Sequence, residues 1–339
     1  MASSQKAKMK VVFGAMSFGQ PSQVTEPEPE NPIFNMFQSR IRVNDVETGN
    51  SILDVLQKHG YNEIDTARLY GNGTSESLLG ELRCQERGLV VSTKYLPMAH
   101  SIPRTVLAEG WNFDQRYTAD MIRRTIQKSL RELKMRGIHI YYNGPDPTVP
   151  LTESLPAIDA VHREGLFVQF GLTRVPAWRV AQIYDACDRW GWVKPTVYQG
   201  MYNFLHRGVE PELLPCLRQY GIQFYAFNPM AGGFLAASDP QGASKASYIN
   251  NAYAAAVELL NPVIEKHGLT LRECALRWLA HHSLLAADKG DAILLGASRA
   301  EHLESNLLDL EKGPLPKEIV ESLDRAWEQV KGLTPKYFF

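Results

Sequence analysis

Short apolar runs rich in β-branched and aromatic residues alternate with longer stretches of helical periodicity along the whole chain. Most of the short runs are nearly continuous in apolar residues, which is typical of parallel strands buried on both faces. We expect eight strands, at residues 10–13, 61–65, 89–94, 138–142, 167–172, 196–199, 223–228 and 292–295. Amphipathic spacing between them predicts helices at 46–59, 121–133, 151–164, 178–190, 212–220 and 271–279.

This alternation, with no long Pro- or Gly-rich linker to divide it, predicts an α/β fold, a (β/α)8 TIM barrel formed by residues 1–339 as one domain. A doubly wound sheet is the alternative, but no GxGxxG fingerprint follows any expected strand. Two segments depart from the repeat: 18–40 reads as an irregular loop, and 237–269 as a polar loop followed by a helix. We expect the barrel core at about 9–325 and the tail at 326–339 to pack back on it, because the chain ends in Tyr337, Phe338 and Phe339.

Charge and cysteine content exclude several functional classes. The 36 basic and 37 acidic residues leave a net charge of −1, which gives no electrostatic reason to bind nucleic acid or a membrane surface. No apolar run approaches the roughly 20 residues of a membrane span, and the N-terminus lacks the apolar region of a secretory signal. The four cysteines are scattered without a CxxC pair, so we expect no zinc site or disulfide and a cytoplasmic location.

Polar residues at the ends of the expected strands are the candidates for chemistry, since barrel enzymes work at the carboxyl ends of their strands. Asp65 ends the second strand, Tyr70 follows five residues later, and Lys94 ends the third strand. An ammonium beside a phenol lowers the pKa of the phenol, and a carboxylate holds the ammonium in place. The three side chains therefore form a candidate proton donor. The alternative is an ordinary buried ion pair of Asp65 with Lys94, with Tyr70 capping a loop.

Several segments resemble the signatures of the aldo-keto reductases. They are DTARLYG at 65–71, SESLLG at 75–80, STK at 92–94, TVYQGMYN at 196–203, FNPMAGG at 227–233 and GAS at 296–298. The chain is most similar to the aflatoxin-aldehyde reductase branch, through TVYQGMYN, the longer run FYAFNPMAGG and the aromatic C-terminus. The resemblance implies a barrel that binds NADPH (NADP) and reduces the carbonyl group of a small-molecule substrate.

The resemblance also implies a role for each matching residue. Tyr70 would be the general acid, Lys94 its pKa-lowering neighbour and Asp65 the partner of Lys94. Thr173 and Gln199 would bind the nicotinamide carboxamide, and Tyr225 would lie near the ring. The rest of the cofactor would contact Arg174, Asn228, Pro229, Met230, Gly232, Ser298, Arg299, His302 and Asn306, with Ser298 and Arg299 on the 2′-phosphate. A helix N-terminus with a guanidinium suits a phosphate, although Ser298 and Glu301 also read as a capping box.

Four departures from the family pattern lie around the cofactor or the carbonyl. Asn143 stands where the family has a histidine, so no imidazole is present there, and Thr173-Arg174 replaces a Ser-Asn pair. Potassium-channel β-subunits resemble this chain at both places. The loop after Leu235 is shorter than in the aflatoxin-aldehyde branch, and His302 replaces a glutamine.

These departures keep two alternatives open. The same fold with lost or altered redox chemistry would act as a dehydratase, isomerase or cyclase on a bulky secondary metabolite. The second alternative is a non-catalytic partner protein that resembles the channel β-subunits. The sequence also leaves open whether the chain forms a homo-oligomer. Five residues are candidates for an apolar or aromatic substrate pocket: Met16, Phe18, Trp111, Tyr202 and Phe339. No spacing of histidines or carboxylates predicts a metal site.

Overall fold

The computed structural model describes residues 8–21, 39–95, 118–144, 149–236 and 250–338. Its strands hydrogen-bond in chain order and close into an eight-stranded parallel barrel, which confirms the predicted TIM barrel. The strands are β1 (Lys10–Gly14), β2 (Glu63–Asp65), β3 (Val90–Tyr95), β4 (Ile138–Asn143), β5 (Phe167–Thr173), β6 (Pro195–Met201), β7 (Gln223–Phe227) and β8 (Ala292–Leu295). Each coincides with one of the eight expected runs.

The helices follow the predicted ranges closely, with three additions. The expected ones are α2 (Val46–Lys58), α4 (Ala119–Leu133), α5 (Leu151–Arg163), α6 (Ala177–Trp190), α7 (Leu213–Gln219) and α11 (Leu271–His281). The additions are α3 (Thr74–Glu81), α12 (Ala300–Glu311) and α13 (Lys317–Val330). The single helix expected before 269 is two, α9 (Asn251–Glu258) and α10 (Asn261–Lys266), with Pro262 at the start of α10 because proline cannot continue the preceding helix.

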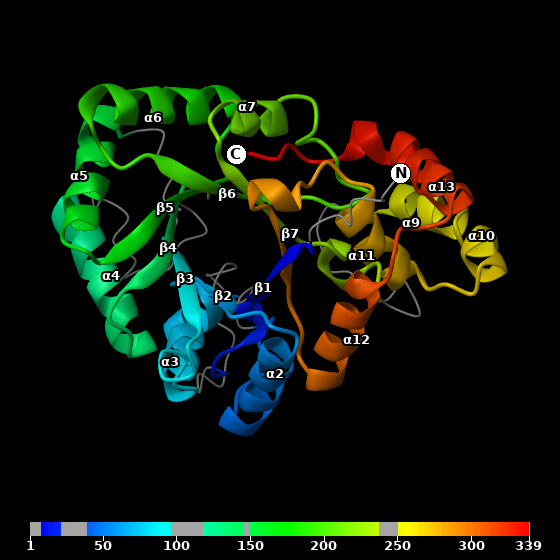
Figure 1. The fold of residues 1–339 in the computed structure, drawn as a ribbon, viewed down its shortest axis with the longest axis horizontal. Helices are drawn as coiled ribbons and strands as arrows, with labels where there is room; N and C mark the ends of the chain where they lie inside the picture. The colour runs from blue at the N-terminus through cyan, green and yellow to red at the C-terminus, as the bar shows by residue number, and fades with distance from the viewer. Residues whose placement is uncertain (1–7, 22–38, 96–117, 145–148, 237–249, 339) are drawn as a thin grey trace, which may run out of the picture. The chain divides into compact units, whose positions relative to one another are not determined.

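The chain divides into two compact units, and the prediction of a single domain stays a prediction. One unit contains 12–198 and 296–303, including β2 to β5. Its register aligns Asp65 with Ser92, and Lys94 with Tyr142, which in turn aligns with Gly171. Figure 1 shows α4 and α5 on the outer side of β4 and β5. The register therefore brings the ends of β2, β3 and β4 to one level.

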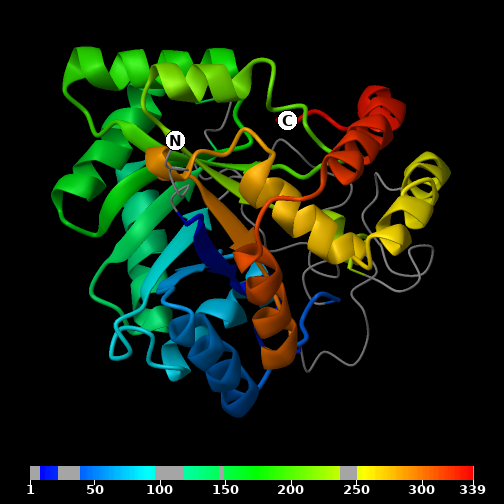
Figure 2. The same cartoon turned by 45° about the vertical axis from the view of Figure 1, so that its right-hand side comes forward.

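The other unit contains the described residues of 1–11, 199–295 and 304–338. In it α13 packs against α9 and α10, as Figure 2 shows in red and yellow. Past α13 the chain contacts the same unit, since Tyr337 donates a hydrogen bond to Glu212 at 2.8 Å and His206 Nε2 lies 3.1 Å from the Pro335 carbonyl. Within the described ranges, no helix combines the length and the apolar content needed to cross a membrane.

Candidate active site

Lys94 and Asp65 form a closed ion pair at the ends of β3 and β2. Lys94 Nζ lies 2.7 and 2.6 Å from the two carboxylate oxygens of Asp65, and it donates to the Thr66 carbonyl at 2.9 Å. Both side chains are almost completely buried, with 5% and 3% of their surfaces exposed. A buried ammonium that donates to both oxygens of a carboxylate and to a carbonyl has a fixed position. Lys94 is therefore a rigidly placed ammonium at the strand ends.

Tyr70 lies directly beside this ammonium. It begins a short 3-10 turn (Tyr70–Gly73), and Lys94 Nζ lies 5.2 Å from the centre of its ring. Burial is the largest influence on the phenol and raises its pKa above the usual 10. The charges of Lys94 and Arg174 lower the pKa and that of Asp65 raises it. Lys94 lowers the pKa of Tyr70, as predicted. The prediction that this pKa lies below its usual value is nevertheless wrong, because the loss of hydration on burial outweighs the effect of the nearby charges.

Tyr142 and Asn143 complete the end of β4 next to this group. The ring of Tyr142 lies 5.5 Å from Lys94 Nζ and occupies the space that a side chain at Gly171 would need. Asn143 is completely buried, and both polar atoms of its amide make no hydrogen bond within the described part of the chain. Because a buried amide without partners costs free energy, this side chain is suited to bind a polar group of a ligand.

Arg174 follows β5 in a left-handed backbone conformation, with φ of 59°. The turn is held by Tyr198, whose hydroxyl accepts from the Val175 amide at 3.0 Å and donates to the Val175 carbonyl at 2.8 Å. The guanidinium is close enough to Tyr70 for each group to shift the pKa of the other. Burial is the main cause that lowers the pKa of Arg174, and the charge of Arg40 lowers it further. Arg40 is a neighbour of the site that the sequence did not reveal, since it stands alone in an irregular loop.

The end of β1 lies beside the residues expected to bind the cofactor phosphate. Ser17 donates to the Ala297 carbonyl at 3.2 Å, next to Ser298 and Arg299. Ser298 is half-buried and Arg299 is exposed, immediately before α12. His302 is exposed on the first turn of α12. The N-terminus of this twelve-residue helix carries a partial positive charge, and the Arg299 guanidinium just before it adds a full one. Together they suit the binding of an anion.

Thr173 is buried at the end of β5, and the remaining predicted cofactor residues fall in the unit that contains β7. Gln199 and Asn306 are buried there, as is Pro229, while Met230 is half-buried. The loop after β7 has left-handed conformations at Asn228 and at 231–233. Three of its amides are already used: those of Ala231, Gly232 and Gly233 bond to the Asn228 carbonyl, to Asn228 Oδ1 and to the Met230 carbonyl. These three amides are therefore not available to a pyrophosphate in this conformation.

Tyr225 does not lie at the carboxyl end of its strand. Its hydroxyl is 2.6 Å from Nζ of Lys10, the first residue of β1, and it pairs in register with Ala292, the first residue of β8. Both neighbours mark the amino ends of the strands. The position next to the nicotinamide ring that the sequence suggested is therefore not supported for Tyr225, and we leave the residue out of the site.

Three of the five predicted pocket residues lie in the described part of the chain. Phe18 is fully buried against Phe13, with ring centres 5.3 Å apart. Tyr202 is fully buried against Trp278 and donates to Glu210 at 2.6 Å. Both are core residues, because their neighbours exclude solvent. Met16 is half-buried and its sulfur accepts from Arg40 at 3.4 Å. Trp111 and Phe339 lie outside the described residues, as does the segment 237–249 after Leu235.

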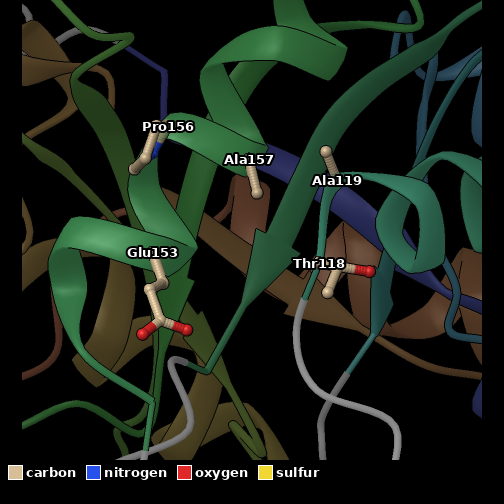
Figure 3. A pocket seen from close by; sticks show the side chains of 5 residues that line it. All are labelled: Thr118, Ala119, Glu153, Pro156 and Ala157. Atoms are coloured by element: carbon tan, nitrogen blue, oxygen red, sulfur yellow. The ribbon is translucent and has the colours of Figure 1, made fainter.

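The cavity drawn in Figure 3 is a different place. It has a volume of about 400 Å³ and is lined by Thr118 and Ala119 at the start of α4 and by Glu153, Pro156 and Ala157 of α5. None of the predicted site residues lines it, and its single ionisable group, Glu153, is exposed. Among the described residues, no group of three or more His, Cys, Asp or Glu side chains is placed to hold a metal ion.

Comparisons with known proteins match most of the chain to one family. The model of the aldo/keto reductase family matches residues 10–328. An aldo-keto reductase of Pseudocercospora fijiensis is 40% identical over 310 residues, covering 85% of this chain and all of that protein. Aldo-keto reductase pigE of Monascus ruber is 36% identical, covering 99% and 98% of the two chains. Aflatoxin B1 aldehyde reductase member 2 of Rattus norvegicus is 37% identical, covering 83% and 80%.

Proposed function

Because this chain belongs to the aldo/keto reductase family and is an oxidoreductase of that family, we propose that it reduces an aldehyde or ketone with NADPH. The observation that carries the proposal is the position of Tyr70 beside the buried Lys94–Asp65 pair, with Lys94 Nζ 5.2 Å from the centre of its ring. A phenol in this position donates its proton to a carbonyl oxygen, and the phenolate left behind is stabilised by the Lys94 ammonium and by Arg174.

The protonation state of Tyr70 suits this role. Its raised pKa keeps the phenol protonated throughout the neutral range, and an acid has to carry its proton when the substrate arrives. Asp65 holds Lys94 in place through both of its carboxylate oxygens. Asn143 cannot donate a proton as an imidazolium does, but its amide N–H can hydrogen-bond the carbonyl oxygen and orient it.

NADPH supplies a hydride when bound, and the described residues fit parts of it. The buried amide of Asn143, which bonds to none of the described residues, matches the donor and acceptor of a carboxamide or the oxygen of a substrate. Ser298 and Arg299 suit a phosphate at the start of α12. The other cofactor residues, Thr173, Arg174, Gln199, Asn228, Pro229, Met230, Gly232, His302 and Asn306, stay predictions from the family resemblance.

Removing the guanidinium at 299 tests the cofactor. We expect Arg299→Ala to weaken NADPH binding about tenfold, the loss of a charge-assisted contact, and to leave NADH binding unchanged because NADH lacks the 2′-phosphate. Tryptophan fluorescence titrations with both nucleotides measure this. Lys317→Ala, an exposed cation on α13, is the control. Binding of neither nucleotide to the unaltered protein would contradict the proposed cofactor, and turnover without nucleotide would support the non-redox alternative.

The pH profile tests the acid. The protonated phenol is the active form and burial raises its pKa, so activity is present at low and neutral pH and lost only as pH rises past that value. We therefore expect kcat/KM for a carbonyl substrate to be level between about pH 6 and pH 9 and to fall at higher pH. If Tyr70 acted as a base, the phenolate would be the active form, and kcat/KM would rise through this pH range.

A further inference from the structure

Glu76 is a buried carboxylate that lies outside the group assigned to proton transfer. It sits in the first turn of α3 and its side chain has no exposed surface. Arg68 makes an ion pair with one of its oxygens, and Thr93 donates to the other at 2.7 Å. The guanidinium of Arg68 is also shielded, with 14% of the side chain exposed. Both carboxylate oxygens therefore have partners on different segments of the chain.

These two partners stand next to the reacting groups in sequence. Arg68 precedes Tyr70 by two residues, in the segment that connects β2 to α3, and Thr93 directly precedes Lys94 on β3. The Arg68 amide also bonds to the Lys94 carbonyl at 3.2 Å, and the Tyr70 amide bonds to the Ala67 carbonyl at 3.0 Å. One carboxylate thus connects the segment that carries the phenol to the strand that carries the ammonium.

A neighbouring pair of hydroxyls fixes the same helix turn to the barrel. Ser75, fully buried, donates to the Ala15 carbonyl at 3.0 Å, and Thr66 lies 2.9 Å from the Ser75 hydroxyl. Because the single Ser75 proton is used by Ala15, Thr66 is the donor to Ser75. The first turn of α3 is therefore held by hydrogen bonds to the residues that directly follow β1 and β2 and to β3 itself, and Glu76 is its one charged member.

A buried ion pair contributes little net stability, since loss of hydration offsets the attraction between the charges. Its directional bonds nevertheless restrict the positions of the segments it connects. We propose that Glu76 is a positioning residue that holds Tyr70 against Lys94 through Arg68 and Thr93. This inference rests on the proposed function for its kinetic consequence, while the position of the phenol is measurable without any catalysis.

Titration of Tyr70 measures the position of the phenol without any catalysis. The chain has 14 tyrosines, so the signal of Tyr70 has to be isolated. The phenolate absorbance is measured against pH with and without the Tyr70→Phe substitution, in the unaltered protein and in Glu76→Gln, and the difference within each pair is the titration of Tyr70. In Glu76→Gln, which keeps the shape of the side chain, we expect the pKa of Tyr70 to fall toward 10, because burial is the main cause that raises it and a released phenol gains water. A Tyr70 titration that matches the unaltered protein would overturn the inference whether or not the chain is a reductase.

Kinetics provide the second measurement. We expect Glu76→Gln to lower kcat about 100-fold, the cost of a misplacement of about 1 Å, with NADPH affinity unchanged. Asp291→Asn is the matched control, since Asp291 is fully buried and paired with Arg218 elsewhere in the fold. It loses a comparable ion pair and should lower the melting temperature without changing kcat or the Tyr70 titration.

A double variant separates position from stability. Arg68→Met with Glu76→Gln removes both charges, so no uncompensated guanidinium remains, and the melting temperature should recover relative to Glu76→Gln alone. The connection to β3 is still altered, so kcat should stay low. Recovery of kcat together with the melting temperature would mean that Glu76 acts only on stability and would overturn the inference. If the unaltered protein reduces no carbonyl, the proposed function fails, and the Tyr70 titration still decides the role of Glu76.

Discussion

Tyr70→Phe is expected to lower kcat for carbonyl reduction by a factor of about 10² to 10⁴, the usual contribution of a general acid. The substitution removes only the hydroxyl, whose pKa the charge of Lys94 lowers, and keeps the ring beside the ammonium. Nucleotide oxidation in the presence of an aldehyde series measures the effect. The affinity for NADPH should be unchanged, because the phenol acts on the substrate oxygen.

Tyr95→Phe is the matched control for this prediction. Tyr95 follows Lys94 on β3, is half-buried and has a pKa that burial raises. Loss of its hydroxyl should leave kcat unchanged. Equal loss of activity in both variants, or full activity of Tyr70→Phe, would contradict the assignment of Tyr70 as the acid.

The strands and the Asp65–Lys94 pair were predictable because they depend on short-range information. Short, nearly continuous apolar runs identify parallel strands, and the carboxyl ends of such strands meet at one face of a barrel. Asp65 and Lys94 end neighbouring strands, so their contact follows from chain order alone. The amphipathic helix α13 lies beyond the eighth strand, so the alternation of strands and helices does not predict it.

Other features depend on quantities that a sequence does not contain. The direction of the Tyr70 pKa shift is a balance between burial and nearby charges, and only coordinates show that burial is larger. The height of Tyr225 in the barrel depends on its register with Ala292. Phe18 and Tyr202 are core residues because of the rings that pack against them. Arg40 reaches Met16 across a loop without periodicity.

Lys94→Met is expected to have the second large effect, on both stability and activity. It leaves the Asp65 carboxylate buried without its counter-ion, which costs about 3–5 kcal/mol in the free energy of unfolding. It also removes the charge that lowers the pKa of Tyr70 and stabilises the phenolate, so kcat should fall with the stability. Urea denaturation and steady-state kinetics measure the two effects separately. Lys194→Met, which removes an exposed ion pair with Asp188, should change the free energy of unfolding far less than Lys94→Met does.

The double variant Lys94→Met with Asp65→Asn distinguishes a structural ion pair from a catalytic one. Without the carboxylate there is no buried charge left uncompensated, so much of the lost stability should return. Activity should not return, because the phenol still lacks the ammonium that stabilises the charge of the phenolate. A double variant that regains both would show that the pair only stabilises the barrel, which is the alternative that the sequence left open for Asp65 and Lys94. Stability regained with activity still lost assigns Lys94 to the chemistry of Tyr70.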